Sequence, residues 1–224
     1  MVATGVQCNV FQVFSFKKGC TRLGKFDVEP TSQTAKYSER DMVVAILYGT
    51  VYVLVLRNNF KAGADVKADI CLFQLGREGF FKSDVLVLDQ NGRFALSVVD
   101  NTIVVHHQAS QTSTVFDIKC LPESGDRPLP YTHRPLLEAR SIAPTFLPSV
   151  DSQQPLPCPL YASSWIVFQP NLVVDARLGA IWAVSLKLEP MVAAIPDAVC
   201  VCMCVCVYVC MCVCMCVCVC SEEQ

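Results

Sequence analysis

Ser83–Ile118 reads SDVLVLDQNGRFALSVVDNTIVVHHQASQTSTVFDI, and this stretch decides the fold of the chain. It contains four runs rich in β-branched and aromatic residues, Ser83–Leu88, Arg93–Val99, Thr102–His107 and Thr112–Ile118. Short segments of turn-forming residues separate the runs, namely Asp89–Gly92, Asp100–Asn101 and Gln108–Gln111. Strands in this rhythm, with no helix between them, predict four antiparallel strands, which is the content of one β-propeller blade.

Further strand candidates lie on both sides of this blade. They are Val10–Phe16, Lys25–Val28, Met42–Leu47, Val51–Leu56, Ala68–Leu75, Trp165–Phe168, Leu172–Val174 and Ala180–Leu186. No long stretch has the periodicity of an amphipathic helix, so the sequence predicts an all-β chain. We expect a partial, WD40-like β-propeller of about three blades, whereas a closed ring needs about four to eight. Such a fragment would expose sheet edges.

The domain organisation follows from proline content and composition. Leu121–Pro159 holds nine of the 13 prolines and predicts a long loop that cannot contain a central strand. The partial propeller is expected to span residues 1–197, and residues 198–224 form a tail that is not a domain.

The tail is dominated by Cys200–Cys220, CVCMCVCVYVCMCVCMCVCVC, which contains ten of the 15 cysteines. Alternating Cys and Val is the translation of a TGTGTG repeat, so we interpret this tract as low-complexity sequence without a fold. Two alternatives stay open. The uncharged run Ala198–Cys220 is long enough for a membrane helix, which would make the chain a tail-anchored or thiol-rich membrane protein. Its thiols could also bind zinc or copper, although Cys-x-Cys spacing differs from the pairs of zinc sites.

Composition limits the compartment and the partners. The cysteines outside the tract, Cys8, Cys20, Cys71, Cys120 and Cys158, are scattered and odd in number, which indicates a reducing compartment. The N-terminus has no basic residue ahead of its apolar stretch, which argues against a secretory signal. The formal net charge of −2 and the lack of basic tracts argue against nucleic acid as a partner.

Candidate catalytic and metal-binding residues are few, and we predict no catalytic, cofactor or metal site. His106 and His107 are neighbours on one strand and cannot converge on one ion, so we interpret them as strand-surface residues. His133 has no partner at metal-ligand spacing and is interpreted as structural. The acidic residues Asp65, Asp69, Asp84 and Asp89 are interpreted as solvated loop carboxylates. The sequence also lacks a nucleophile elbow, an H-E-x-x-H pair and a phosphate-binding loop.

Three of the strand-rich segments carry a family resemblance. They are SERDMVVAILYGTVYVLVLR (Ser38–Arg57), GRFALSVVDNTIVVHHQASQTSTVFDIK (Gly92–Lys119) and SSWIVFQPNLVVDARLGAIWAVSLKLEP (Ser163–Pro190). These strings are similar to the amino-terminal half of the regulator of the Mon-Ccz complex, also called the colon-cancer-associated Mic-one family. The resemblance extends over about Asn9–Asp197.

The resemblance implies a non-enzymatic subunit that pairs a β-propeller with a helical solenoid. Its implied partner is the Mon-Ccz heterodimer, which exchanges guanine nucleotide on the late-endosomal Rab GTPase of the Rab-seven type. The implied setting is cytoplasmic, peripheral on late endosomes and lysosomes, in vesicle trafficking and autophagy. No helical half follows Asp197 in this sequence, and no individual binding residue is implied.

Overall fold

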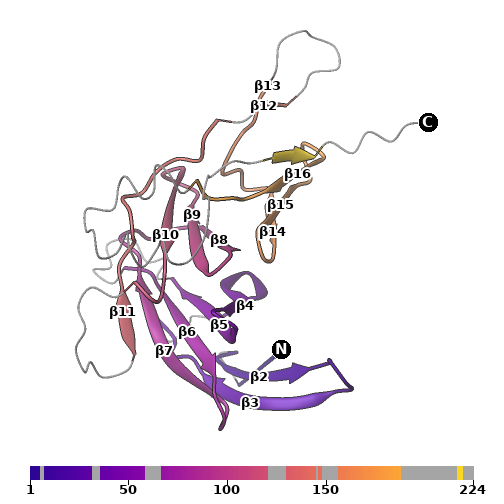
Figure 1. Cartoon of the computed structure of the whole chain (residues 1–224), viewed down its shortest axis with the longest axis vertical. Coiled ribbons are helices and arrows are strands. Elements are labelled where there is room, and N and C mark those ends of the chain that lie inside the picture. Colours follow the sequence, from indigo (N-terminus) through magenta and orange to yellow (C-terminus); the bar gives the residue numbers. More distant parts are fainter. Residues whose placement is uncertain are drawn as a thin grey trace. The chain divides into compact units, whose positions relative to one another are not determined.

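The structure of the chain is a computed structural model that describes residues 1–5, 8–31, 36–58, 67–120, 130–144, 146–147, 156–187 and 216–218. Within these ranges the regular elements are strands and one short 3-10 helix, η1 (Glu39–Asp41), without any α-helix. The sheets are small and mostly antiparallel, as expected for a partial propeller-like fold (Figure 1). The predicted all-β class is therefore confirmed.

The chain divides into two compact units, and the first is Met1–Gly92 together with Leu121–Arg134. One of its sheets has the order β1-β2-β3, with β1 Val2–Thr4, β2 Val10–Ser15 and β3 Thr21–Asp27. The other has the order β11-β7-β6-β5-β4. Its strands are β4 Met42–Leu47, β5 Thr50–Arg57, β6 Asp69–Leu75, β7 Phe80–Val87 and β11 Tyr131–His133.

The core of unit 1 lies between these two sheets. Buried side chains of β2 and β3 and the residue after β3 meet those of β5 and β6, and the cluster consists of Phe11, Val13, Phe26, Val28, Val53, Val55, Cys71 and Phe73. The rings of Phe26 and Phe73 stack with centroids 4.3 Å apart. Strand alternation supplies these residues, because every second side chain of a strand points to the same face.

Two glycines allow β3 to approach the turn before β7. A Cβ atom built on Gly24 would lie 2.6 Å from the Cα of Gly79, closer than real side chains come. Gly79 itself has a φ of +130°, a conformation that other residues avoid. This contact explains why a glycine interrupts β3, where it otherwise weakens a strand.

Unit 2 consists of Arg93–Cys120 together with Pro135–Gln224. Its first sheet has the order β10-β9-β8, with β8 Phe94–Val99, β9 Thr102–His107 and β10 Thr112–Phe116. Its second sheet has the order β14-β15-β16-β17, with β14 Trp165–Phe168, β15 Leu172–Asp175, β16 Ala180–Ala183 and β17 Cys216–Cys218. A two-stranded ladder joins β12 (Phe146–Leu147) to β13 (Leu156–Pro157).

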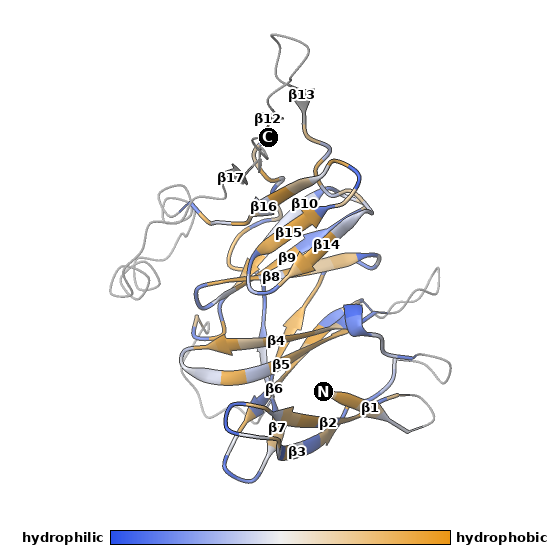
Figure 2. Cartoon of the chain, turned by 90° about the vertical axis from the view of Figure 1, so that its right-hand side faces the viewer, coloured by the Kyte–Doolittle hydropathy of each residue, from blue (hydrophilic) through white to orange (hydrophobic). Residues whose placement is uncertain are grey.

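The core of unit 2 is built around Trp182, which is fully buried. Side chains from both sheets and their connections surround it, and the cluster contains Val99, Val104, Val115, Ile142, Tyr161, Val173, Ala180, Val184 and Leu186. Two hydrogen bonds also join the sheets: Val98 N–H donates to the Pro170 carbonyl (2.6 Å), and Gln169 Nε2 donates to the Leu96 carbonyl (3.0 Å). Figure 2 shows the hydrophobic colouring of β15 in this unit and of β4 in unit 1.

The strands of the predicted blade are real, but their grouping is wrong. The first run is part of β7, which pairs with β6 and β11, whereas β8, β9 and β10 form a separate sheet. Asp89–Gly92 therefore connects two sheets instead of closing a hairpin. The second neighbour of β7 comes from the proline-rich stretch, a pairing that local turn residues do not reveal.

The described parts of the proline-rich loop and of the tail contain short strands. β11 is an edge strand, in line with the prediction that the loop holds no central strand. In the Cys/Val tract, Cys216–Cys218 pairs with β16, where the sequence predicts no strand. The rest of the tract lies outside the described residues, and the domain limits 1–197 and 198–224 stay predictions.

Replacing Trp182 by Ala should strongly destabilise unit 2. The substitution removes a fully buried ring from the core and leaves a cavity, so the expected loss of unfolding free energy is about 3 kcal/mol. Urea denaturation monitored by circular dichroism measures this loss. The matched control is Ile181→Ala on the same strand, where the side chain is 42% exposed and the expected loss is about 1 kcal/mol or less. Equal losses would contradict the assignment of the two faces of β16.

Candidate functional site

One face of the sheet formed by β14, β15 and β16 is apolar and exposed. The register places Ile166 opposite Val174 and Val174 opposite Ile181, so these three side chains form a row across the sheet. Phe168 and Leu172 are opposite each other in the next row on the same face. We call these five residues the open apolar face; Ile166, Phe168, Leu172 and Ile181 are 51%, 54%, 41% and 42% exposed.

The sequence produces this face because almost every position of the three strands is apolar. The alternate residues Val173 and Trp182 point into the core, and those between them face outward. Strands that are apolar at consecutive positions are typical of sheets covered on both faces. Grouped exposed apolar side chains mark contact surfaces for other proteins. The open apolar face is therefore the candidate protein-interaction surface.

A cavity of about 220 Å³ lies elsewhere in unit 2. Apolar side chains form most of its wall, namely Val104, Val115, Leu137, Ile142, Ala143 and Leu186. Its polar lining consists of Ser113, Glu138, Arg140, Ser141 and Lys187. The segment that carries Arg140 is held against β10 by two backbone hydrogen bonds between Arg140 and Ser113, of 2.7 and 3.0 Å.

His106 lies inside unit 2, bonded to two serines. Its Nδ1 is 2.8 Å from Ser113 Oγ, and its Nε2 is 3.2 Å from Ser97 Oγ. Tyr161 extends the network, since its hydroxyl is 2.7 Å from Ser113 Oγ and accepts a hydrogen bond from the Ile142 N–H (2.9 Å). Burial lowers the pKa of His106 to about 4.

This network resembles a Ser–His nucleophile pair only in composition. The imidazole nitrogen opposite Ser113 contacts the hydroxyl of Ser97, whereas catalytic triads place a carboxylate there to stabilise the imidazolium. A histidine with a pKa of about 4 is also a weak base at neutral pH. The arrangement holds β8, β9 and β10 in register and is poorly suited to activating a serine.

The interpretation of His106 and His107 as strand-surface residues is wrong, because both are buried. His107 Nδ1 lies 2.7 Å from Ser110 Oγ, and its ring centroid is 4.8 Å from that of Phe94. Short polar residues beside each histidine accept or donate these bonds, so burial leaves the rings satisfied.

His133 and Asp84 form a buried pair in unit 1. His133 Nε2 is 2.8 Å from Asp84 Oδ1, and the parallel pairing of β11 with β7 brings the two side chains together. The interpretation of Asp84 as a solvated loop residue is wrong, since it is 5% exposed. The structural interpretation of His133 is supported, with a carboxylate partner that sequence spacing did not reveal.

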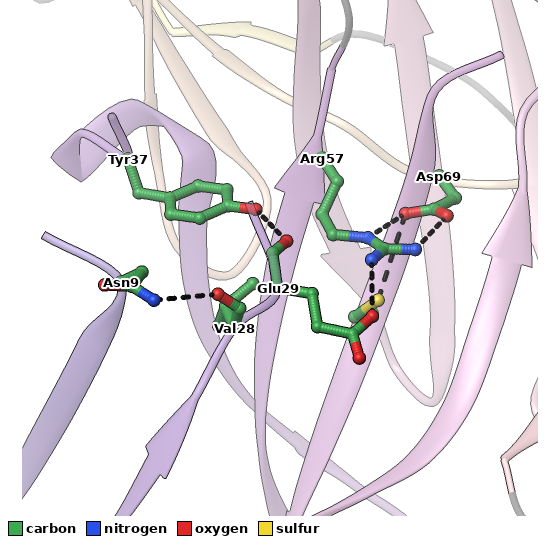
Figure 3. Close-up of polar contacts among 7 residues, drawn as sticks. Asn9, Val28, Glu29, Tyr37, Arg57 and Asp69 are labelled. Carbon is green, nitrogen blue, oxygen red and sulfur yellow. Dashed lines mark hydrogen bonds and ion pairs between the residues drawn. The ribbon is translucent and has the colours of Figure 1, made fainter. Parts of the chain in front are cut away.

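Arg57, at the end of β5, organises a polar cluster at one end of unit 1 (Figure 3). Its Nε donates to Asp69 Oδ1 (2.7 Å), and its Nη1 lies 3.6 Å from Glu29 Oε2. The Tyr37 hydroxyl donates to the Glu29 carbonyl (2.8 Å). The hydrogen bond to Asp69 raises the pKa of Arg57, and burial raises the pKa of Tyr37 to about 12. The cluster ties the segment after β3 to the ends of β5 and β6.

The remaining acidic candidates differ in their surroundings. Asp69 is not solvated as predicted, because it is only partly exposed and pairs with Arg57. Asp89 is exposed, and its Oδ1 lies 3.2 Å from Lys67 Nζ. This agrees with the prediction of a solvated carboxylate. Asp65 lies outside the described residues. In the described ranges no three His, Cys, Asp or Glu side chains lie close enough together to hold a metal ion.

Among the described residues, no helix has the length and hydrophobicity needed to span a bilayer. Most of Ala198–Cys220, on which the tail-anchor alternative rests, lies outside those residues.

The stability of the chain should fall as the pH is lowered from about 6.5 to 4, because of His106. Unfolding restores the ordinary pKa of 6.5, so in this window the unfolded state binds the proton and the folded state does not. The contribution of neutral His106 to the free energy of unfolding is fully present above pH 6.5. Its loss by pH 4 amounts to about 3 kcal/mol. Urea midpoints measured against pH test this. The His106→Gln variant should show a flatter profile, and identical slopes in both proteins would contradict the assignment.

Comparison with known proteins finds relatives of this chain among curated sequences. A human protein named Regulator of MON1-CCZ1 complex is 44% identical over 208 residues, which cover 88% of this chain and 31% of that protein. The mouse protein of the same name is 42% identical over the same extent. The chain thus spans 31% of the length of these relatives.

No family model matches the chain. A match over 88% of the chain includes β4 to β16, and with them the open apolar face, wherever the unmatched residues lie at the two ends. Identity at this level confirms the resemblance that the sequence predicts. Over the matched residues, the chain is a homologue of the regulators of the MON1-CCZ1 complex.

Proposed function

We propose that this chain is a non-catalytic regulatory subunit that binds the MON1-CCZ1 complex. The observation that carries the proposal is the 44% identity to a human protein named as the regulator of that complex. The open apolar face supports it, because this surface is suited to contact with another protein. The buried, neutral His106 network also fits a subunit without its own catalytic chemistry.

The finer part of the proposal concerns what the complex does. In this proposal, MON1-CCZ1 is the guanine-nucleotide exchange factor of the late-endosomal Rab-seven GTPase. The chain modulates that exchange without contacting nucleotide. The chain acts from the cytoplasm, held peripherally on late endosomes and lysosomes through the complex, in endosome–lysosome maturation and autophagy. The family resemblance of Ser38–Arg57, Gly92–Lys119 and Ser163–Pro190 supports this part.

Within this proposal the partial propeller of residues 1–197 carries the binding surface. Residues 198–224 contribute no domain, in keeping with their low-complexity composition.

The full chain should co-precipitate with purified MON1-CCZ1 heterodimer, and the double variant Phe168→Asp with Ile181→Asp should be retained about tenfold less. Two carboxylates on the open apolar face would have to lose water when a partner covers it, which opposes binding. The matched control is Ile46→Asp, which charges a 65% exposed apolar side chain on β4 in unit 1. Urea midpoints confirm that the variants are folded.

The outcomes separate the two levels of the proposal. Failure of the unmodified chain to associate with MON1-CCZ1 would contradict the binding role. In a nucleotide-release assay on the Rab-seven GTPase, the chain should change the rate only when MON1-CCZ1 is present. Release stimulated by the chain alone would contradict a non-catalytic role.

A further inference from the structure

The cavity of unit 2 combines an apolar wall with a charged rim. Val104, Val115, Ile142 and Leu186 belong to the buried core, so the wall is fixed by packing. Leu137 is partly buried and packs against the same core. A preformed, mostly apolar wall with a few polar groups is the general character of small-molecule sites.

The rim carries an exposed guanidinium. Arg140 lines the cavity, as does the exposed carboxylate of Glu138. Among the described residues, the Arg140 guanidinium takes part in no salt bridge, unlike Arg57 in unit 1. Its fork of donors matches a carboxylate bidentately. Arg140 thus offers a binding group for an anion at the mouth of the cavity.

The two serines of the lining already form hydrogen bonds within the protein. Polar groups of a ligand would therefore be bound by the charged side chains at the rim. Ser113 bonds to His106 and Tyr161, and Ser141 Oγ donates to the Gln111 carbonyl (2.8 Å). A ligand rich in hydroxyl or amide groups would therefore find few partners along the wall. An aliphatic body with polarity at one end fits this distribution.

The size of the cavity limits the ligand. Apolar cavities of about 150 Å³ accept benzene, and drug-sized ligands occupy about 300–1,000 Å³. The 220 Å³ here lies between these values. The space suits an aliphatic chain of medium length.

We propose that this cavity is a binding site for a free medium-chain fatty acid, with the alkyl chain against Val115, Leu137 and Leu186 and the carboxylate at Arg140. The site goes beyond the proposed regulatory function and does not depend on it. It would give the chain a response to an amphipathic metabolite.

The test uses the full chain without MON1-CCZ1 and sodium octanoate as the probe. Titration followed by calorimetry and by ¹H–¹⁵N chemical shifts should show saturable binding, with shifts at the cavity residues. Arg140→Gln should weaken binding about tenfold, since it removes a charge-assisted interaction. Glu138→Gln should tighten it by removing the opposing carboxylate. Leu137→Trp should abolish it by filling the cavity, and Ala143→Phe serves instead if that variant does not fold.

The matched control is Arg93→Gln, which removes an exposed arginine of the same unit away from the cavity and should leave the affinity unchanged. Octan-1-ol should bind about as weakly to the unmodified chain as octanoate does to Arg140→Gln. Absence of saturable binding, equal affinity for octanoate and octan-1-ol, or insensitivity to Arg140→Gln and Leu137→Trp would each overturn the proposal. Because MON1-CCZ1 is absent from the experiment, failure here and failure of the proposed function are distinguishable.

Discussion

The stacking of one apolar sheet face on another is the interaction on which both units depend. In unit 1 the stacked rings of Phe26 and Phe73 join the two sheets, and in unit 2 the buried ring of Trp182 has the same role. Apart from the two-stranded β12–β13 ladder, the described sheets have three to five strands, and an apolar face left in water makes each of them less stable. Packing of the larger sheets on one another removes these faces from water, and the open apolar face is a surface of the same kind that remains exposed.

The local sequence pattern predicts where the strands lie but not which strands pair with one another. Alternation and turn residues placed β4, β5, β8, β9 and β10 close to their observed limits. The assignment of β7 to a blade with β8 failed because pairing depends on which edge is free, and β11 occupies the outer edge of β7 from far along the chain. Gly24 shows the same limit, since its close approach to Gly79 is a tertiary contact with no local signal.

The polar candidates were harder to predict than the fold. Burial of His106 requires the hydroxyls of Ser97 and Ser113 on neighbouring strands, which become its partners only through the register of the sheet. Asp84 and His133 are likewise paired by strand addition. The open apolar face could have been read from consecutive apolar residues in β14–β16, but which of the two faces is exposed depends on where Trp182 points. The cavity had no sequence signal, because its wall comes from four separate segments.

Unit 1 is discontinuous along the chain, since β11 follows the whole of β8–β10 yet belongs beside β7. The ribosome synthesises the polypeptide from its N-terminus, so Asp84 emerges well before His133. Until His133 follows, Asp84 is hydrated and one edge of β7 has no paired strand. The sheet of β8–β10 can form while the sheet that contains β7 still lacks β11. Nascent chains stalled between Phe116 and Tyr131 would thus carry an unfinished sheet that is available to chaperones.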